Sequence, residues 1–340
     1  MKKGITKILS ACVFAFVVFL AAGTQSKAAV NMGVKQTGAG SSYVDLAWDA
    51  QLGAGHYHTQ FSQDGKNWID MDNSSSPSES VYNLTQGASY YARVVAYKGS
   101  HYTGTHVMIG VSETAIVSTK PTEVSGLTQT AAGVNSVSMS WNASAGAASY
   151  VIYGYINYNW TQIGTSATNS ATITGVAATT STRFSVAAVK NVTGGTVTGD
   201  QCSGVEMKAI PIKVSRIAMQ YYWDSLKEAK YIWTDVNNAD GYQYEVKSAN
   251  GKKTYFRATS TNSYTYVKPF PRGIFVKARV RAYVTVGNKV YYGAWSPYTY
   301  HASSKKVTAK RSSNGKKIYL KWKKVSGASG YQVYVSTKSN

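Results

Sequence analysis

The feature that most constrains this chain is a motif that recurs with a period near ninety residues. A tryptophan followed nine positions later by a tyrosine occurs four times, and successive tryptophans lie 93, 92 and 89 positions apart. A regular period of this length is typical of a tandem array in which each copy is one structural unit. The four pairs are Trp48 and Tyr57, Trp141 and Tyr150, Trp233 and Tyr242, and Trp322 and Tyr331.

The segments around the motif alternate with a period of two. In residues 242–247 and 276–282, apolar and polar side chains take turns, which is typical of half-buried strands. Asp64-Gly65, Asn250-Gly251 and Gly287-Asn288 fit hairpin turns. Past residue 28 no convincing helical period is present. We therefore predict an all-β fold class, with roughly seven short strands and one core tryptophan in each two-sheet β-sandwich.

A second segment repeats in phase with the first. Residues 92–97, 184–189 and 278–283 begin 44, 43 and 45 positions after their tryptophans. The first copy also contains Leu-Thr-Gln-Gly-Ala-Ser-Tyr at residues 84–90. Together these patterns resemble the fibronectin type III domain, an immunoglobulin-like sandwich. That family carries a core tryptophan on its second strand and an aromatic residue opening its third. Its Leu-x-x-Gly-x-x-Tyr corner matches residues 84–90.

The resemblance implies a structural core role for the motif residues and for the corner Tyr90. Thr182 and Val276 stand where the corner tyrosine is expected in the second and third copies, so no such corner is expected there. The phase predicts repeats at 30–120, 121–208 and 209–302, and an incomplete one at 303–340. We expect the natural protein to extend beyond this last repeat, because half a sandwich leaves sheet edges and an apolar face open.

The N-terminus predicts export. Lysines at positions 2, 3 and 7 precede a short apolar run, and small residues lead to a cleavage point after Ala28. This is typical of a secretory signal peptide over residues 1–28. Acylation of Cys12 is disfavoured, because most of the apolar run follows this cysteine. Cleavage leaves Cys202 as the one thiol and leaves no apolar stretch of membrane-spanning length, so we expect a secreted or cell-surface protein.

No known catalytic constellation is present in the sequence. The zinc-protease, nucleophile-elbow and phosphate-loop patterns are all absent, and two cysteines exclude a disulfide framework or a Cys-rich metal site. Asp70 and Asp72 share a strand face, but a sandwich face supplies no cleft for paired-carboxylate catalysis. We predict that the chain is not an enzyme, has no catalytic residue and needs no cofactor.

Four of the five histidines fall in the first repeat. His56 and His58 flank the inward Tyr57, and the neighbouring strand leads into the loop that carries His101 and His106. Imidazole groups suit zinc or copper, which makes these four residues candidates for a surface metal site. Exposed polar histidines are the favoured interpretation, because no carboxylate that could orient the ligands is evident. No metal is therefore expected.

The excess of positive charge is confined to the second half of the mature chain. The net charge is +21 overall. It is −2 for residues 29–120, zero for 121–208, +9 for 209–301 and +10 for 302–340. In the third repeat the alternation places cations together on one sheet face, where they could hold a polyanion and Tyr rings could add flat surfaces for sugars. The competing interpretation is a solvated face that discourages edge-to-edge aggregation. The candidate residues are Lys247, Lys252, Lys253, Arg257, Lys277, Arg279 and Arg281.

These observations lead to two hypotheses about function. The first is a non-catalytic extracellular array that binds an anionic polysaccharide, a cell-wall polymer or a surface protein, and otherwise serves as a spacer. The second is an accessory region of a secreted polysaccharide or cell-wall hydrolase whose catalytic domain lies outside this chain. Export makes nucleic acid an unlikely partner. Oligomeric state is not indicated by any sequence pattern.

Overall fold

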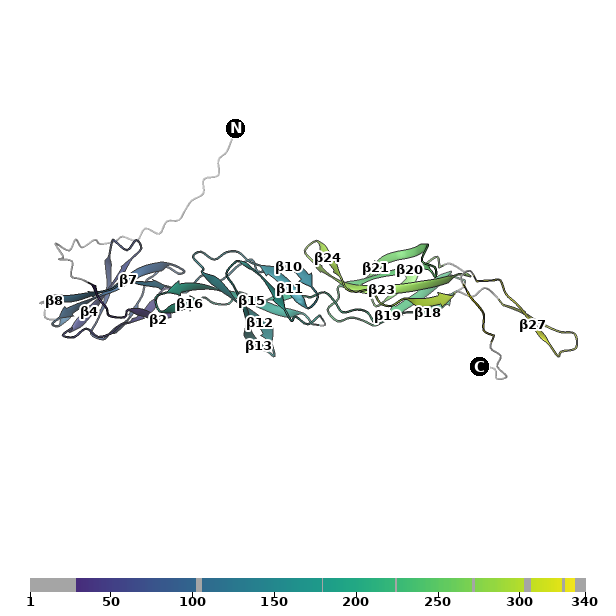
Figure 1. Ribbon diagram of the computed structural model, residues 1–340, viewed down its shortest axis with the longest axis horizontal. Helices are drawn as coiled ribbons and strands as arrows, with labels where there is room; N and C mark the ends of the chain where they lie inside the picture. Colours follow the sequence, from purple (N-terminus) through teal and green to yellow (C-terminus); the bar gives the residue numbers. More distant parts are fainter. Residues whose placement is uncertain are drawn as a thin grey trace, which may run out of the picture. The chain divides into compact units, whose positions relative to one another are not determined.

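The computed structural model describes residues 29–101, 106–178, 180–223, 225–270, 273–302, 307–325 and 328–333. Every regular element in these ranges other than turns is a β-strand, which confirms the all-β prediction (Figure 1). The predicted signal peptide, its cleavage point and Cys12 lie outside the described residues.

Within the described ranges, no helix is long and apolar enough to cross a membrane.

The described residues of the first repeat form nine strands. They are β1 (Ala29–Val30), β2 (Lys35–Ala39), β3 (Val44–Ala47), β4 (His56–Ser62), β5 (Ile69–Ser74), β6 (Ser78–Val81), β7 (Ser89–Lys98), β8 (Val107–Ser112) and β9 (Ala115–Ser118). One sheet has the order β1-β8-β7-β4-β5, with β9 also pairing with β7, and a second has the order β2-β3-β6. β4 pairs antiparallel with both β5 and β7.

The second repeat divides its strands in the same way. They are β10 (Thr128–Gly133), β11 (Ser136–Ser140), β12 (Ser149–Ile156), β13 (Asn159–Ser166), β14 (Ser170–Thr174), β15 (Thr182–Val192), β16 (Gly195–Thr198) and β17 (Val205–Met207). The two sheets have the orders β10-β11-β14 and β13-β12-β15-β16, with β17 also pairing with β15. Buried residues of both sheets, Met139 and Ile152 among them, form one core.

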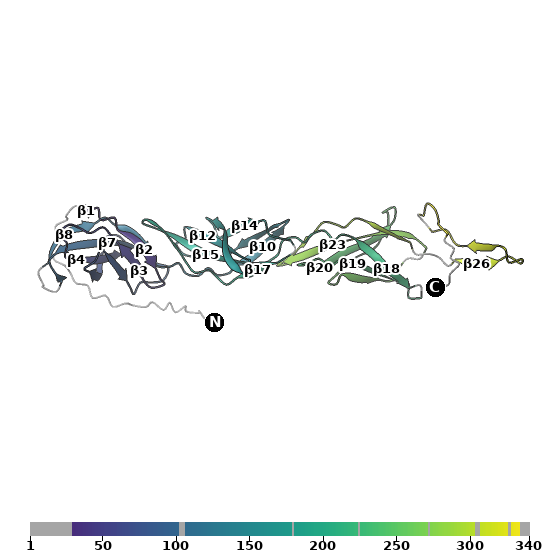
Figure 2. The same cartoon turned by 90° about the horizontal axis from the view of Figure 1, so that it is seen from below.

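The third repeat carries the same strand order. Its strands are β18 (Ile217–Trp223), β19 (Glu228–Trp233), β20 (Gly241–Ser248), β21 (Thr254–Ser260), β22 (Tyr264–Val267), β23 (Phe275–Val286), β24 (Lys289–Tyr292) and β25 (Thr299–Ala302). One sheet is β18-β19-β22 and the other is β21-β20-β23-β24, with β25 also pairing with β23. Figure 2 shows β18, β19, β20 and β23 together in the third repeat.

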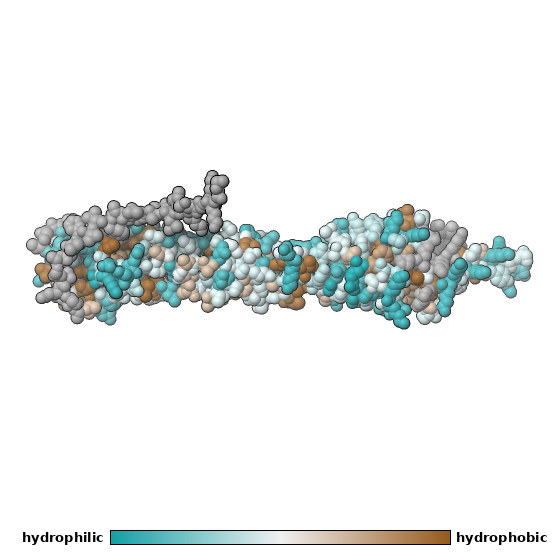
Figure 3. All heavy atoms as spheres, turned by 90° about the horizontal axis from the view of Figure 1, so that it is seen from above, coloured by the Kyte–Doolittle hydropathy of each residue, from teal (hydrophilic) through white to brown (hydrophobic). Residues whose placement is uncertain are grey.

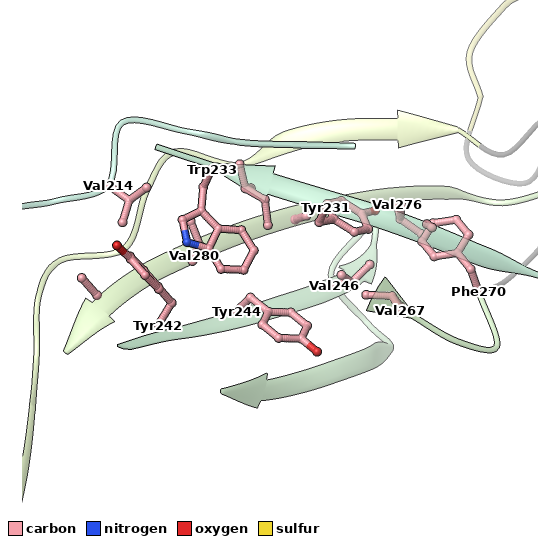
Figure 4. Close-up of a cluster of buried hydrophobic side chains, with 14 of the residues drawn as sticks. Val214, Tyr231, Trp233, Tyr242, Tyr244, Val246, Val267, Phe270, Val276 and Val280 are labelled. Atoms are coloured by element: carbon pink, nitrogen blue, oxygen red, sulfur yellow. The ribbon is translucent and has the colours of Figure 1, made fainter. Parts of the chain in front are cut away.

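The core of the third repeat lies between these two sheets (Figure 4). Tyr231 and Val267 come from one sheet, and Tyr242, Val246 and Val280 come from the other; all are buried. Burying a large apolar side chain contributes about 1.5–3 kcal/mol to stability. Since every second residue of β20 and β23 points to this core, the intervening polar residues must lie on the outer face of their sheet.

The Trp and Tyr of the repeated motif make the same two interactions in all four described copies. The rings meet edge to face, with centroids 5.3–5.4 Å apart. The tyrosine hydroxyl also accepts a hydrogen bond of 2.6–3.0 Å from the backbone N–H six residues before it. This bond satisfies a backbone amide in the segment between the tryptophan and the tyrosine. It therefore explains why these two residues are always nine positions apart. The corner predicted at Tyr90 is confirmed, because its hydroxyl accepts from the Thr85 N–H at 2.9 Å.

The fourth repeat differs from the expectation for a core. Its described residues form one hairpin, β26 (Thr308–Arg311) with β27 (Ile318–Lys321). Tyr331 is 45% exposed and Trp322 is only partly buried, so the prediction that both lie in a core is wrong. Their interaction with each other is local, whereas burial requires a second sheet that the described residues of this repeat do not form. The other predicted core residues, from Trp48 to Tyr242, are buried.

Candidate functional site

The outer face of the β21-β20-β23 sheet carries five of the seven cations singled out in the sequence, and the other two lie in the turn between β20 and β21. Lys247 lies opposite Lys277 across the β20–β23 pair, and Arg279 lies opposite Glu245. Arg257 reaches the same row from β21, where it too is paired with Glu245. Lys252 and Lys253 belong to the turn between β20 and β21 and are exposed. We call these seven residues the basic face.

Glu245 lies at the centre of the basic face with its side chain fully buried. Its Oε2 accepts hydrogen bonds from Nη2 and Nε of Arg257 at 2.5 and 3.2 Å. Its Oε1 accepts from Nε of Arg279 at 2.6 Å and from the Tyr298 hydroxyl at 3.0 Å, and Nζ of Lys247 lies 3.1 Å away. Burial by itself raises the pKa of Glu245, but these hydrogen bonds more than reverse the effect and lower it to about 2. Glu245 is therefore the shared counter-ion of three cations.

Aromatic rings separate the arginines of β23 from one another. Cζ of Arg281 lies 3.8 Å from the ring centroid of Tyr292 and 4.4 Å from that of Trp295. Cζ of Arg279 lies 4.4 Å from the Trp295 centroid and 4.7 Å from that of Tyr298. Guanidinium groups and rings thus alternate as a ladder, in which each cation is attracted to the faces beside it. The three-residue spacing of Tyr292, Trp295 and Tyr298 is the sequence signal for this ladder, although the rings were not among the predicted site residues.

The seven cations differ in how available they are to a ligand. Arg279 and Arg281 are held in the ladder, and Arg281 also donates to Oε1 of Gln243 at 2.6 and 2.9 Å. Arg257 remains 54% exposed despite its bond to Glu245. With one carboxylate against seven cations, the basic face keeps six uncompensated positive charges. Figure 3 shows hydrophilic side chains gathered over the third repeat.

The opposite sheet of the third repeat presents a second surface that no sequence prediction covered. Tyr221, Lys230 and Tyr266 lie in one row across β18, β19 and β22. The Trp223 ring is tilted by 39° against that of Tyr221, with ring centroids 4.4 Å apart, and Tyr264 lies beside Tyr266 at 5.9 Å. Nζ of Lys230 is 5.1–5.8 Å from three of these rings. We call these five residues the aromatic platform; alternating aromatic residues at 221, 223, 264 and 266 are its sequence signal.

The structure brings the four candidate histidines of the first repeat together. His56 and His58 lie at the start of β4, and His101 and His106 lie between β7 and β8. The interpretation of all four as exposed side chains is wrong for His56, which is only 2% exposed. The reason is that the Tyr97 ring stacks on it and the carbonyl oxygen of Gly99 lies 2.9 Å from its Nδ1.

The other residues considered for chemistry in the sequence, Cys202, Asp70 and Asp72, are either buried in the core or exposed to solvent. Sγ of the buried Cys202 accepts a hydrogen bond from the Val186 N–H at 3.2 Å. Asp70 and Asp72 are exposed on β5, and Asp70 accepts a hydrogen bond from Nε2 of Gln60 at 2.6 Å. None of these three groups lies in the basic face or the aromatic platform.

Comparison with known proteins finds likeness among solved structures. No protein-family profile and no curated protein matches the chain. Among solved structures, it is similar to the crystal structure of the FN1–FN3 domains of chicken CNTN1, at 16% sequence identity and a TM-score of 0.30. The match covers 81% of this chain and 98% of that one. The strand orders decide the fold class: the first three repeats each divide their strands between two sheets, so the chain forms tandem β-sandwiches with an immunoglobulin-like arrangement.

Proposed function

We propose that this protein is a non-catalytic extracellular array whose third repeat binds an anionic polysaccharide or cell-wall polymer, while the other repeats act as spacers. The observation that carries the proposal is the basic face, which has six uncompensated charges on one sheet and its adjoining turn. A polyanion that neutralises such a face releases its counter-ions, which favours binding and makes it depend on salt. The extracellular setting rests on the signal-like sequence of residues 1–28.

The rings of the third repeat favour a sugar polymer as the partner. Both outer faces of the sandwich combine aromatic side chains with cations: the ladder on one sheet and the aromatic platform on the other. Flat rings offer apolar surface to sugar rings, and cations beside them attract acidic substituents. Three of the platform rings, those of Trp223, Tyr264 and Tyr266, are more than 40% exposed and so accessible to a ligand.

The test is salt-dependent binding of the whole chain to heparin as the anionic probe. The first variant replaces Lys252, Lys253 and Lys277 by Gln, because these lysines have no ion pair with Glu245 and their loss leaves its hydrogen bonds intact. Weaker binding is expected, and the slope of log affinity against log salt should fall by up to about one for each lysine that pairs with an anionic group of heparin. Arg279 and Arg281 are left unchanged, since each lies between two rings of the ladder, whereas Lys277 contacts only the ring of Tyr298, at 4.5 Å from its centroid.

Two further variants separate the charge of this face from charge elsewhere in the chain and from the aromatic platform on the opposite sheet. Replacing the exposed Lys35, Lys66 and Lys98 of the first repeat by Gln removes the same charge elsewhere, and heparin affinity is expected to change little. Trp223→Ala is expected to weaken binding at every salt concentration without changing the slope. Equal affinity and equal slope for the chain and its Lys252/Lys253/Lys277 variant would refute the proposal.

A further inference from the structure

Three of the four histidines of the first repeat bring a ring nitrogen to a common point at the start of β4. One ring nitrogen each from His56, His58 and His101 lies within 4.8 Å of the others. Three atoms separated by no more than this distance have a common point at most about 2.8 Å from each of them, whereas Zn–N bonds are about 2.0–2.1 Å long. A metal ion at that point would therefore require each ligand to move inward by less than about 1 Å.

The rings of all four histidines also have a suitable arrangement. Every one of the six centroid separations among His56, His58, His101 and His106 lies between 5.4 and 6.3 Å. The ring of His106 is therefore close to the other three, although its nitrogens are not among the three ligand atoms that lie within 4.8 Å of one another.

His56 is oriented as a metal ligand would be. Its Nδ1 lies 2.9 Å from the Gly99 carbonyl oxygen, so the ring N–H is placed there and Nε2 keeps its lone pair. Metal-binding imidazoles are commonly held in this way, by a hydrogen bond from the second ring nitrogen to a backbone carbonyl. The sequence favoured exposed histidines because no orienting carboxylate was evident, and here a carbonyl takes that role. Gly55 permits the close approach, since a Cβ at this position would lie 2.3 Å from the same oxygen.

Two of the imidazoles lack the partner that a buried nitrogen needs. Nε2 of His56 and Nε2 of His58 are both shielded from solvent, and neither has a hydrogen-bond partner among the residues that the structure describes. His56 as a whole is 98% buried, and Tyr97 stacks on it with ring centroids 5.1 Å apart. Buried polar atoms almost always have a partner, so an unpaired nitrogen in a histidine cluster points to a ligand.

We propose that His56, His58 and His101 bind a first-row transition-metal ion, with His106 beside the fourth coordination position. An all-imidazole donor set suits Zn²⁺ or Cu²⁺ and not the oxygen-preferring Ca²⁺ or Mg²⁺. The ion would join β4 to the connection between β7 and β8, and it would raise the stability of the first repeat. This site is separate from the basic face, and its test does not depend on polyanion binding.

The experiment is a titration of the whole chain, free of any histidine tag, with ZnCl₂ alone and in competition with a chromogenic chelator. One equivalent of Zn²⁺ is expected to bind and to raise the thermal unfolding temperature. His58→Ala and His101→Ala should each weaken binding by more than the roughly 10–100-fold that loss of an outer-shell partner costs. Circular dichroism without metal shows whether each variant is folded.

The matched control is His301→Ala, which removes the histidine that lies outside the cluster, in the third repeat. It should leave zinc affinity unchanged. A chain that binds neither Zn²⁺ nor Cu²⁺, or that binds them equally well after His58 and His101 are both replaced, would overturn the proposal. Equal weakening by His301→Ala would overturn it too, since it would mean scattered binding to surface imidazoles.

Discussion

Glu245→Gln tests whether the basic face is organised by its one buried carboxylate. The substitution keeps the size and shape of the side chain but removes the charge that faces Arg257, Arg279 and Lys247. Those cations would then repel one another without a counter-ion, on a face where Arg279 and Lys247 are largely covered. We expect the third repeat to lose stability at neutral pH.

The magnitude follows from the pKa of Glu245. Its value falls from an ordinary 4.5 to about 2, which corresponds to about 3 kcal/mol of preferential stabilisation of the ionised form. Removing one partner of a buried ion pair costs about 3–5 kcal/mol, and the lower end applies here because Arg257 remains half exposed. Both arguments give a loss of about 3 kcal/mol for Glu245→Gln at pH 7.

The pH dependence has a definite sign. Because the folded-state pKa is depressed, the stabilisation is fully present above pH 4.5 and is lost as the pH falls toward 2. At pH 3 about half of it remains, and the difference between the chain and its variant should shrink to about 1.5 kcal/mol. A protonated glutamic acid resembles glutamine, which is why the two forms converge in acid.

The assay is hydrogen exchange of backbone amides in β20 and β23, measured by mass spectrometry in the whole chain at pH 7 and pH 3. The protection of these amides from exchange reports the stability of the third repeat alone. A single unfolding curve of the whole chain would combine the stabilities of several repeats. Glu228→Gln is the control, because no described ion pair involves this residue, and its effect should stay within about 0.5 kcal/mol. A loss below about 1 kcal/mol for Glu245→Gln at pH 7, or one that does not change with pH, would refute the reasoning.

Two smaller substitutions test local features of the other repeats. Tyr150→Phe removes the acceptor of the Ser144 amide and should lower the stability of the second repeat by about 1 kcal/mol, seen as faster exchange in β12. Unchanged exchange would mean that water replaces the hydroxyl without loss. Gly55→Ala would displace the Gly99 carbonyl that orients His56, and zinc affinity should fall by about 10–100-fold in the chelator titration. An unaltered affinity would show that this carbonyl does not position the ligand.

Much of the basic face could be predicted from alternation alone. A period of two tells which residues of β20 and β23 share a face, and the register confirms that Lys247, Lys277 and Arg279 do. The same pattern cannot tell what covers that face. The rings of Trp295 and Tyr298 reach it from the segment between β24 and β25, and Glu245 becomes buried only because its partners close over it.

The histidine cluster shows the same division. The sequence placed His56 and His58 on one face of a strand and the other two histidines near the adjacent strand. The burial of His56 could not be predicted from the sequence, because the Gly99 carbonyl and the Tyr97 ring that enclose it are more than forty residues away along the chain. The fourth repeat is the converse case, since its motif rings meet while its Tyr331 stays exposed.

The sequence by itself therefore determined the repeat, the all-β class, the inward and outward sides of each strand and the location of the charge. These follow from spacing and period, which act between neighbouring residues in the chain. Tertiary structure alone decided which cations share a counter-ion, which arginines lie between rings and which imidazoles are shielded from water. Those outcomes depend on packing between strands that are distant in sequence, where the loss of solvent changes the energy of a charge or a lone pair.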